Sequence, residues 1–264
     1  LPIWILLALL FNGLILHAYG EKKAMEFLSA YLLEKSLSVD NIFVFSILFS
    51  YFAVPPVLQH KVLFWGIFGA LVMRIIFIFT GIQLIQNFHW ILYVFGAFLI
   101  FSGIKMVLSS DKEMTPDTNI FIKWMKRVLP ISDQFHNTRF FIRIDGKVMM
   151  TRLFFVLLLI EFTDLIFAID SIPAVLAISD DPFIVYTSNV FAILGLRSLY
   201  FAVAGMNEYF RFLKYGLAAI LVFVGIKMCL VDLFKIPIEW SLLVILVILG
   251  TSILLSKLIS QTKK

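Results

Sequence analysis

The stretch EFTDLIFAIDSIPA, residues 161–174, places three acids inside a run that is otherwise apolar. The acids are Glu161, Asp164 and Asp170. A charged side chain in the middle of a bilayer costs at least about 2.5–3.5 kcal/mol on insertion scales, and such residues usually face a polar interior and mark a functional pathway. The fold of the chain therefore depends on whether this run crosses a membrane, and its function on what surrounds the acids.

The whole chain is too apolar for a soluble domain of its length. Of its 264 residues, 61% are hydrophobic and 15% are charged, and the mean hydropathy is +1.00. Apolar stretches of about twenty residues recur, and each can cross a hydrocarbon core about 30 Å thick. A transmembrane β-barrel would show shorter, alternating segments. The sequence therefore predicts an all-α, polytopic transmembrane helical bundle.

Eight spans are predicted, at residues 1–18, 27–53, 61–85, 88–108, 151–178, 183–205, 210–230 and 238–257. Most Lys and Arg residues outside them fall on one side, which also carries the long polar segment 109–150 and the C-terminus. Only Lys22, Lys23 and Lys235 fall on the other side. Because basic loops stay in the cytoplasm, we expect the segment 109–150 and the C-terminus to be cytoplasmic. The net charge of +5 then reflects orientation and not nucleic-acid binding.

The long polar segment has two recognisable parts. NIFIKWMKRVL at 119–129 is typical of a short basic amphipathic helix on a membrane surface. FFIRIDGKVMM at 140–150 is typical of a β-hairpin, because Asp145-Gly146 suits a tight turn. The segment is either an ordinary connector or a regulatory element.

The run at residues 161–174 has a counterpart earlier in the chain. LSVDNIF at 37–43 matches FAIDSIP at 167–173. The match aligns three pairs of polar residues: Glu34 with Asp164, Asp40 with Asp170, and Asn41 with Ser171. Glu161 has no acidic counterpart, since Tyr31 holds the matching position.

The match continues along the chain. Each half next carries an arginine inside a span, Arg74 or Arg197, and then the tetrapeptide GIKM, at 103–106 or 225–228. Each copy contains three predicted spans, and an odd number forces the second copy to enter the membrane from the opposite side. Two inverted three-helix repeats are therefore predicted, a plan common in transporters. The predicted divisions are an N-terminal helix (1–20), the first repeat (27–108), the cytoplasmic segment (109–150), the second repeat (151–230) and a C-terminal helix and tail (238–264).

The acids share helix faces with other oxygen ligands. Glu34 and Asn41 are seven residues apart, with Ser38 one turn after Glu34, and Asp164 and Ser171 repeat the spacing of seven. Carboxylate, hydroxyl and amide oxygens suit hard cations such as Mn²⁺, Mg²⁺ or Ca²⁺. The sequence predicts a metal site of this kind, formed by Glu34, Asp40, Asn41, Glu161, Asp164, Asp170 and Ser171, with Ser38, Arg74 and Arg197 in support.

Structural roles for these residues stay open at this point. Arg74 and Arg197 can neutralise Asp40 and Asp170 as buried ion pairs that fix helix packing. Such pairs are a weaker explanation for the acids as a group, because the acids outnumber the arginines inside the spans.

Two other assignments also stay open. Lys35 is positioned to pair with Glu34, which would reduce the surplus of acids in the first repeat. Asp164 and Asp170 could form the aspartyl dyad of an intramembrane hydrolase, although an inverted repeat favours transport. The sequence contains no GxSxG, HExxH or phosphate-binding glycine loop, so we expect no enzyme and no organic cofactor.

Several long motifs resemble one family. They are EKSLSVDNIFVF, HKVLFWGIFGALVMR, FHWILYVFGAFLIFSGIKM, RIDGK, EFTDLIFAIDSIPA and DPFIVYTSNVFAILGLRSLYF. Together they resemble the TerC family of integral membrane proteins, including its Alx-like members, over essentially the whole chain. The family is named for tellurium resistance, is associated with manganese efflux and is grouped with LysE-type exporters. It usually carries one further helix upstream of the first residue here.

The resemblance implies Mn²⁺ export across the bacterial inner membrane through the acidic motifs. Ca²⁺ and Mg²⁺ stay open as substrates, and the expected partners are the metal ion and the lipid bilayer. The alternative is a membrane scaffold or stress-response protein that acts through its cytoplasmic segment. The sequence does not decide the oligomeric state, the direction of transport or the coupling ion.

Overall fold

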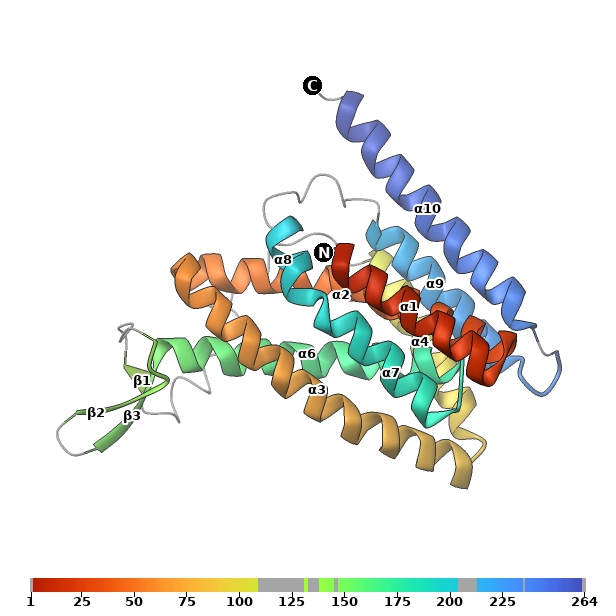
Figure 1. The fold of residues 1–264 in the computed structure, drawn as a ribbon, viewed down its shortest axis with the longest axis horizontal. Coiled ribbons are helices and arrows are strands. Elements are labelled where there is room, and N and C mark those ends of the chain that lie inside the picture. The colour runs from red at the N-terminus through yellow and green to blue at the C-terminus, as the bar shows by residue number, and fades with distance from the viewer. Residues whose placement is uncertain are drawn as a thin grey trace.

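The computed structural model describes residues 2–108, 131–132, 138–144, 147–203, 213–234 and 236–262. The first half contains four helices: α1 (Pro2–Tyr19), α2 (Glu21–Tyr51), α3 (Pro56–Asn87) and α4 (Ile91–Leu108). Three short strands follow: β1 (Ile131–Ser132), β2 (Phe141–Ile144) and β3 (Lys147–Thr151). The second half contains α6 (Arg152–Leu176), α7 (Pro182–Leu194), α8 (Leu196–Val203), α9 (Leu213–Cys229) and α10 (Ile238–Thr262). Figure 1 shows the helices as one elongated bundle, from which the strands project at one end.

The predicted helical membrane protein agrees with this structure. Within the described residues, five segments are long and apolar enough to cross a membrane: Pro2–Tyr19, Pro56–Asn87, Ile91–Leu108, Pro182–Ala202 and Ile238–Ser256. α2 and α6 are long helices that carry several charged residues each, and α9 has only 17 residues. The eight spans and the inverted repeats therefore stay predictions.

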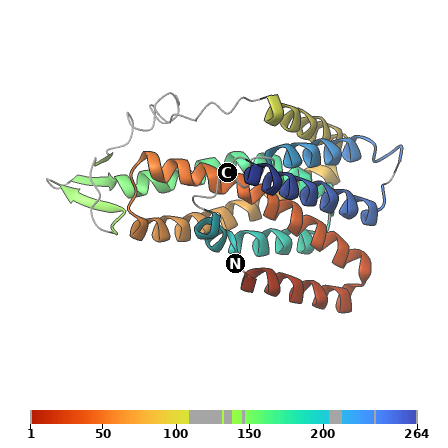
Figure 2. The same ribbon diagram turned by 90° about the horizontal axis from the view of Figure 1, so that it is seen from above.

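The core lies where α2, α3 and α6 meet α7 and α9. α3 packs along α6, α2 packs along α7, and α10 covers α2 and α9. α4 lies beside α9, as Figure 2 shows. Glycines let these two helices approach closely, because a Cβ atom added at Gly225 would lie 2.6 Å from the Gly96 carbonyl oxygen.

The predicted span 183–205 is not one continuous helix. α7 ends at Leu194 and α8 begins at Leu196, so the helix breaks at Gly195. Lys35 of α2 donates a hydrogen bond from Nζ to the Ala192 carbonyl oxygen at 3.1 Å. The Lys35 ammonium group donates a hydrogen bond to a carbonyl near the C-terminal end of α7. Its positive charge also interacts favourably with the negative end of the α7 helix dipole. Lys35 therefore caps α7, and its expected pairing with Glu34 is wrong.

The predicted hairpin is confirmed. β2 and β3 pair antiparallel, with Ile144 opposite Lys147, which leaves a two-residue connection. β1 pairs in parallel with β3. The amphipathic helix predicted at 119–129 lies outside the described residues.

Candidate cation site

Four helices meet at the side chain of Arg74, which is 2% exposed. Its Nη1 atom contacts Glu34 Oε1 of α2 and Asn189 Oδ1 of α7, and lies 3.4 Å from Ser171 Oγ of α6. Its Nη2 atom lies 3.7 Å from Asp164 Oδ1 of α6. We call these residues, together with Asn41, the Arg74 cluster. Asn41 belongs to it because its Nδ2 donates to Asp164 Oδ1 at 3.2 Å.

Helical spacing brings these side chains together. Glu34 and Asn41 lie on one face of α2, and Asp164 and Ser171 lie on one face of α6, at the same spacing of seven residues. Ser38 is buried on the same part of α2, but its hydroxyl donates to the Glu34 backbone carbonyl at 2.8 Å. The Ser38 hydroxyl therefore forms its hydrogen bond within α2, and Ser38 is not part of the cluster.

The Arg74 cluster contains several buried polar atoms that form no hydrogen bond with any described residue. Among the described residues, no hydrogen bond reaches five of its buried atoms: Glu34 Oε2, Asn41 Oδ1, Arg74 Nε, Asp164 Oδ2 and Asn189 Nδ2. A buried polar group left in this way typically costs about 1–3 kcal/mol, so native structures rarely keep one without water or an ion nearby. Three of the five are oxygens that can bind a cation.

A cavity of about 50 Å³ lies beside the cluster. It is lined by Glu34, Leu37, Asn41, Arg74, Met106, Phe167, Asp170, Ser171 and Leu221. One water needs about 10–15 Å³ by the same measure, so this space admits a small ion with some of its water. Asp170 reaches this cavity and accepts a hydrogen bond from Ser102 Oγ at 2.8 Å.

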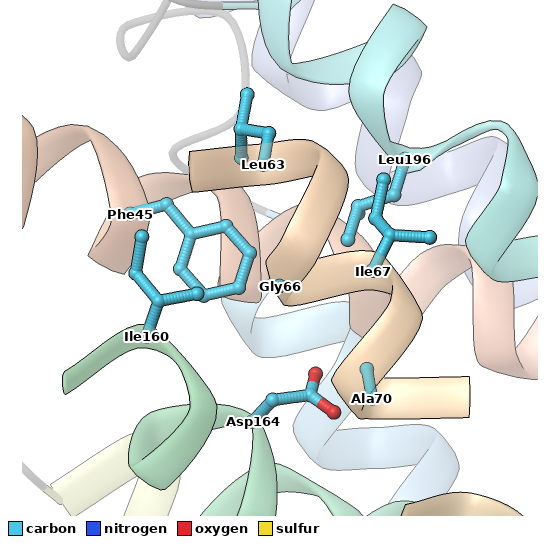
Figure 3. A pocket seen from close by; sticks show the side chains of 8 residues that line it. All are labelled: Phe45, Leu63, Gly66, Ile67, Ala70, Ile160, Asp164 and Leu196. Atoms are coloured by element: carbon cyan, nitrogen blue, oxygen red, sulfur yellow. The ribbon is translucent and has the colours of Figure 1, made fainter. Parts of the chain in front are cut away.

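A second, smaller cavity lies on the other side of Asp164. Its volume is about 10 Å³, and its lining is Phe45, Leu63, Gly66, Ile67, Ala70, Ile160, Asp164 and Leu196. Figure 3 shows Asp164 reaching from α6 toward Ala70 of α3, with apolar side chains around it. The Asp164 carboxyl group is thus shared by the Arg74 cluster and a small, mostly apolar cavity.

A third cavity, of about 880 Å³, opens at the end of the bundle where α2 begins. We call it the vestibule. Its lining includes eight polar or charged residues: Lys22, Glu26, Gln86, His89, Ser179, Asp180, Lys227 and Glu239.

The three cavities follow one order along the bundle. On α2 the lining residues run from Glu26 in the vestibule, through Glu34 in the middle cavity, to Phe45 in the smallest. The lining residues of α3 and α6 give the same order of cavities, although the residue numbers there rise toward the vestibule. On α6, Ile160 lines the smallest cavity, Asp170 the middle cavity and Leu176 the vestibule. The cavities therefore mark a discontinuous line through the protein, with the Arg74 cluster near its middle.

Only some of the residues predicted to form the metal site lie close together in the structure. Glu34, Asn41, Asp164 and Ser171 converge on Arg74, and Asp170 lines the adjoining cavity. Within the described part of the chain, no three His, Cys, Asp or Glu side chains form a ready-made metal site. The side chain of Asp40 lies outside the described residues.

Two predicted site residues lie elsewhere. Glu161 packs against α3, where a Cβ atom added at Gly69 would meet its carboxylate. Arg197 is exposed, and its Nη2 lies 3.2 Å from His60 Nδ1. The expected ion pair between Arg197 and Asp170 is therefore wrong: Asp170 accepts a hydrogen bond from Ser102, and Arg197 lies on the exposed side of α8.

Asn189 is the cluster residue that the sequence prediction missed. It has no polar counterpart in the predicted first repeat, and it belongs to neither of the two polar stripes with a spacing of seven residues. The available signal was an amide next to Ser188 in the apolar run of 182–194, since both side chains are at most 1% exposed.

A buried charged cluster, in a bundle whose described residues include five membrane-compatible segments, defines the chain as an integral, multi-pass membrane protein with a polar interior. Residues 19–264 match the family model described as integral membrane protein TerC family, and the chain belongs to this family.

Curated relatives agree over nearly the whole chain. An uncharacterized membrane protein of Myxococcus xanthus is 48% identical over 259 residues, which cover 98% of this chain and 81% of the relative. Alx of Escherichia coli (strain K12), a proposed membrane-bound redox modulator, is 51% identical over 94% of this chain and 79% of its own length. An uncharacterized membrane protein of Rickettsia bellii is 42% identical over 91% of this chain and 80% of its own length. No solved structure matches.

Proposed function

We propose that this protein exports a hard divalent cation, foremost Mn²⁺, across the bacterial inner membrane. The observation that carries the proposal is a set of three buried oxygens around Arg74 that accept no hydrogen bond from any described residue: Glu34 Oε2, Asn41 Oδ1 and Asp164 Oδ2. All three belong to residues at most 4% exposed, where an unsatisfied oxygen is costly. A cation that passes between α2 and α6 would satisfy them.

The order of the cavities supports transport over static binding. A resident structural ion needs one closed site, whereas a transported ion needs a path to both sides of the membrane. Here the vestibule has a volume of about 880 Å³, whereas the cavity beyond Asp164 has a volume of only about 10 Å³. Such asymmetry is the expected form of an alternating-access transporter that is open on one side.

The chemistry of the site favours hard cations. Its ligands are carboxylate, amide and hydroxyl oxygens, which suit Mn²⁺, Mg²⁺ and Ca²⁺. Tellurite is an oxyanion, and Glu34 and Asp164 would repel it. The substrate is therefore a cation, even though the family name refers to tellurium.

The inverted repeat gives the proposal a mechanism. The copies correspond as α2 with α6, α3 with α7 and α8, and α4 with α9. Two features of the structure support this correspondence: α2 and α6 supply the acids that face Arg74, and α4 packs against α9. Rocking of one copy against the other would expose the site to each side in turn. Exchange against protons is the proposed driving reaction, since burial favours the protonated form of a carboxylate.

Transport into proteoliposomes that contain a Mn²⁺-sensitive dye tests the proposal. Glu34→Gln and Asp164→Asn should each slow Mn²⁺ transport by about tenfold or more, because each removes a charged ligand. Asp232→Asn is the matched control, since the Asp232 side chain is 51% exposed and lies outside the cluster. If both cluster variants transport as fast as the control, the site is assigned wrongly.

We also propose that the acids serve binding and not hydrolysis. A catalytic aspartyl dyad needs two carboxylates that share a proton. Asp164 interacts with Arg74 and Asn41, whereas Asp170 accepts a hydrogen bond from Ser102. Cleavage of a transmembrane peptide substrate by the purified protein would contradict this assignment.

The hairpin favours a second candidate function, as a docking element for a partner protein. Its apolar residues Phe141, Ile144 and Val148 are 47%, 40% and 61% exposed. In this case deletion of 112–147 should abolish the cellular phenotype while the acid substitutions leave it intact. The reverse result would exclude the scaffold function.

A further inference from the structure

Arg74 places a positive charge where the proposed function requires a metal ion. Its guanidinium contacts Glu34 Oε1 and lies 3.7 Å from Asp164 Oδ1, so it occupies one oxygen of each buried acid. We propose that Arg74 is a tethered counter-cation that holds the site between transport steps and must leave it before a divalent cation binds fully. This inference rests on the proposed function and adds a specificity-determining residue to it.

The count of free oxygens supports displacement of Arg74. While Arg74 stays in place, only one oxygen each of Glu34, Asn41 and Asp164 is free among the described residues. Hard divalent cations prefer about six to eight oxygen ligands. A metal ion can add water, but it gains the second oxygen of each carboxylate only if the guanidinium withdraws.

The charges of the cluster lead to the same conclusion. With the acids ionised, Glu34 and Asp164 contribute two negative charges and Arg74 one positive charge. A monovalent ion offers the two acids no more charge than Arg74 already does. A divalent ion offers twice as much and repels the guanidinium at short range. Competition with Arg74 would therefore select divalent over monovalent cations.

Arg74 also connects the helices that must move. Its side chain joins α3 to α2 through Glu34, to α6 through Asp164 and to α7 through Asn189. Withdrawal of the guanidinium breaks all of these contacts at once. Occupancy of the site is thereby linked to the packing of the proposed first repeat against the second.

Equilibrium binding of Mn²⁺ to the purified full chain in nanodiscs tests this role, with free Mn²⁺ measured by electron paramagnetic resonance. Arg74→Gln removes the competing charge, so its affinity for Mn²⁺ should rise by about tenfold or more while transport slows. Arg74→Lys keeps a charge but cannot span both acids, so its affinity should lie between those of Arg74→Gln and the parent. Arg197→Gln is the matched control, because Arg197 is an exposed arginine outside the cluster. Affinity of Arg74→Gln equal to or below that of Arg197→Gln would overturn the proposal.

A chemical-rescue experiment separates competition from a purely structural role. In Arg74→Ala, free guanidinium at millimolar concentration should re-enter the cluster and compete with Mn²⁺, whereas equal sodium chloride should not. The parent protein should show no such competition, because its own side chain fills the position. Equal effects of the two salts on Arg74→Ala would overturn the proposal. Absence of Mn²⁺ binding by the parent would instead overturn the proposed function, and this inference with it.

Discussion

At the scale of single residues, Arg74 is the centre of the candidate site, because its guanidinium lies against polar side chains of α2, α6 and α7. Glu34 with Asn41 and Asp164 with Ser171 were predicted as polar stripes, and both stripes reach Arg74. One open alternative paired Arg74 with Asp40, whose side chain lies outside the described residues. Among the described residues, the Arg74 guanidinium lies between Glu34 and Asp164. Periodicity describes one helix, and contacts between helices depend on packing that no local pattern contains.

Asn189 gives a prediction at this scale. Asn189→Ala removes a buried acceptor from Arg74, so it should lower the free energy of unfolding by about 1–3 kcal/mol. Asn87→Ala is the control, because the exposed Asn87 amide donates only to a nearby backbone carbonyl within α3. Thermal unfolding of both variants in detergent measures the difference. Equal midpoints would mean that Asn189 contributes nothing to the cluster.

At the scale of elements, the hairpin was predictable because its signal is local, with Asp-Gly between two apolar runs. The break between α7 and α8 at Gly195 was not predictable from the sequence, because it depends partly on a contact with another helix. Lys35 reaches from α2 to a carbonyl near the end of α7, and a Cβ atom at Gly195 would lie 2.4 Å from its Nζ. A contact between residues 157 positions apart in the chain leaves no local signature.

The close approach of α4 and α9 gives a prediction for these elements. Gly225→Ala places a Cβ atom 2.6 Å from a backbone oxygen, so the two helices must separate and stability should fall by about 1–3 kcal/mol. Gly13→Ala in α1 is the control, because a Cβ atom there meets nothing within 4 Å. The control should be neutral or slightly stabilising, since alanine favours helix. The midpoints of thermal unfolding in detergent test both expectations, and an unchanged midpoint for Gly225→Ala would contradict the close packing.

The N-terminus of α7 gives a prediction that depends on pH. Asp181 caps this helix by accepting from Phe183 N at 3.0 Å, and it pairs with Lys23 at 3.1 Å. Burial raises the pKa of Asp181, but the hydrogen bonds from Lys23 and from the Phe183 amide outweigh burial and lower its pKa below the usual value. A depressed folded-state pKa contributes stability above the unfolded pKa of about 3.9, and this contribution is lost as the pH falls through the folded pKa.

Asp181→Ala should therefore cost about 0.5–2 kcal/mol at neutral pH, and the difference from the parent should shrink below pH of about 4. Asp181→Asn keeps a capping oxygen without the charge, so its cost should be smaller and nearly independent of pH. Thermal unfolding between acid and neutral pH measures all three proteins. A difference between parent and Asp181→Ala that stays constant with pH would contradict the role of the charge.

At the scale of the whole molecule, composition alone predicted a helical membrane protein, because a chain that is surrounded by lipid needs an apolar surface and therefore a high mean hydropathy. The line of cavities was not predictable, since cavities arise from the way helices pack. The vestibule lies at the end where α2 begins, and the hairpin lies at the other. With the predicted orientation, the vestibule faces out of the cytoplasm.

Labelling with a membrane-impermeant thiol reagent tests this orientation in cells, in a Cys229→Ser background that removes the one native cysteine. Gln86→Cys lines the vestibule and should react with reagent added outside, whereas Thr138→Cys, beside the hairpin, should react only after the membrane is opened. Ala70→Cys, in the smallest cavity, should react slowly from either side. Labelling of Thr138→Cys in intact cells would contradict the orientation.

The central claim is that a divalent cation binds between Glu34 and Asp164. A structure of the protein soaked in Mn²⁺, with anomalous diffraction to locate the ion, tests it most directly. We expect an anomalous peak at about 2.0–2.6 Å from oxygens of both acids, the range of bonds between hard cations and oxygen, with the Arg74 guanidinium withdrawn from them. A Mn²⁺ peak outside this cluster, or no peak at saturating Mn²⁺, would contradict it.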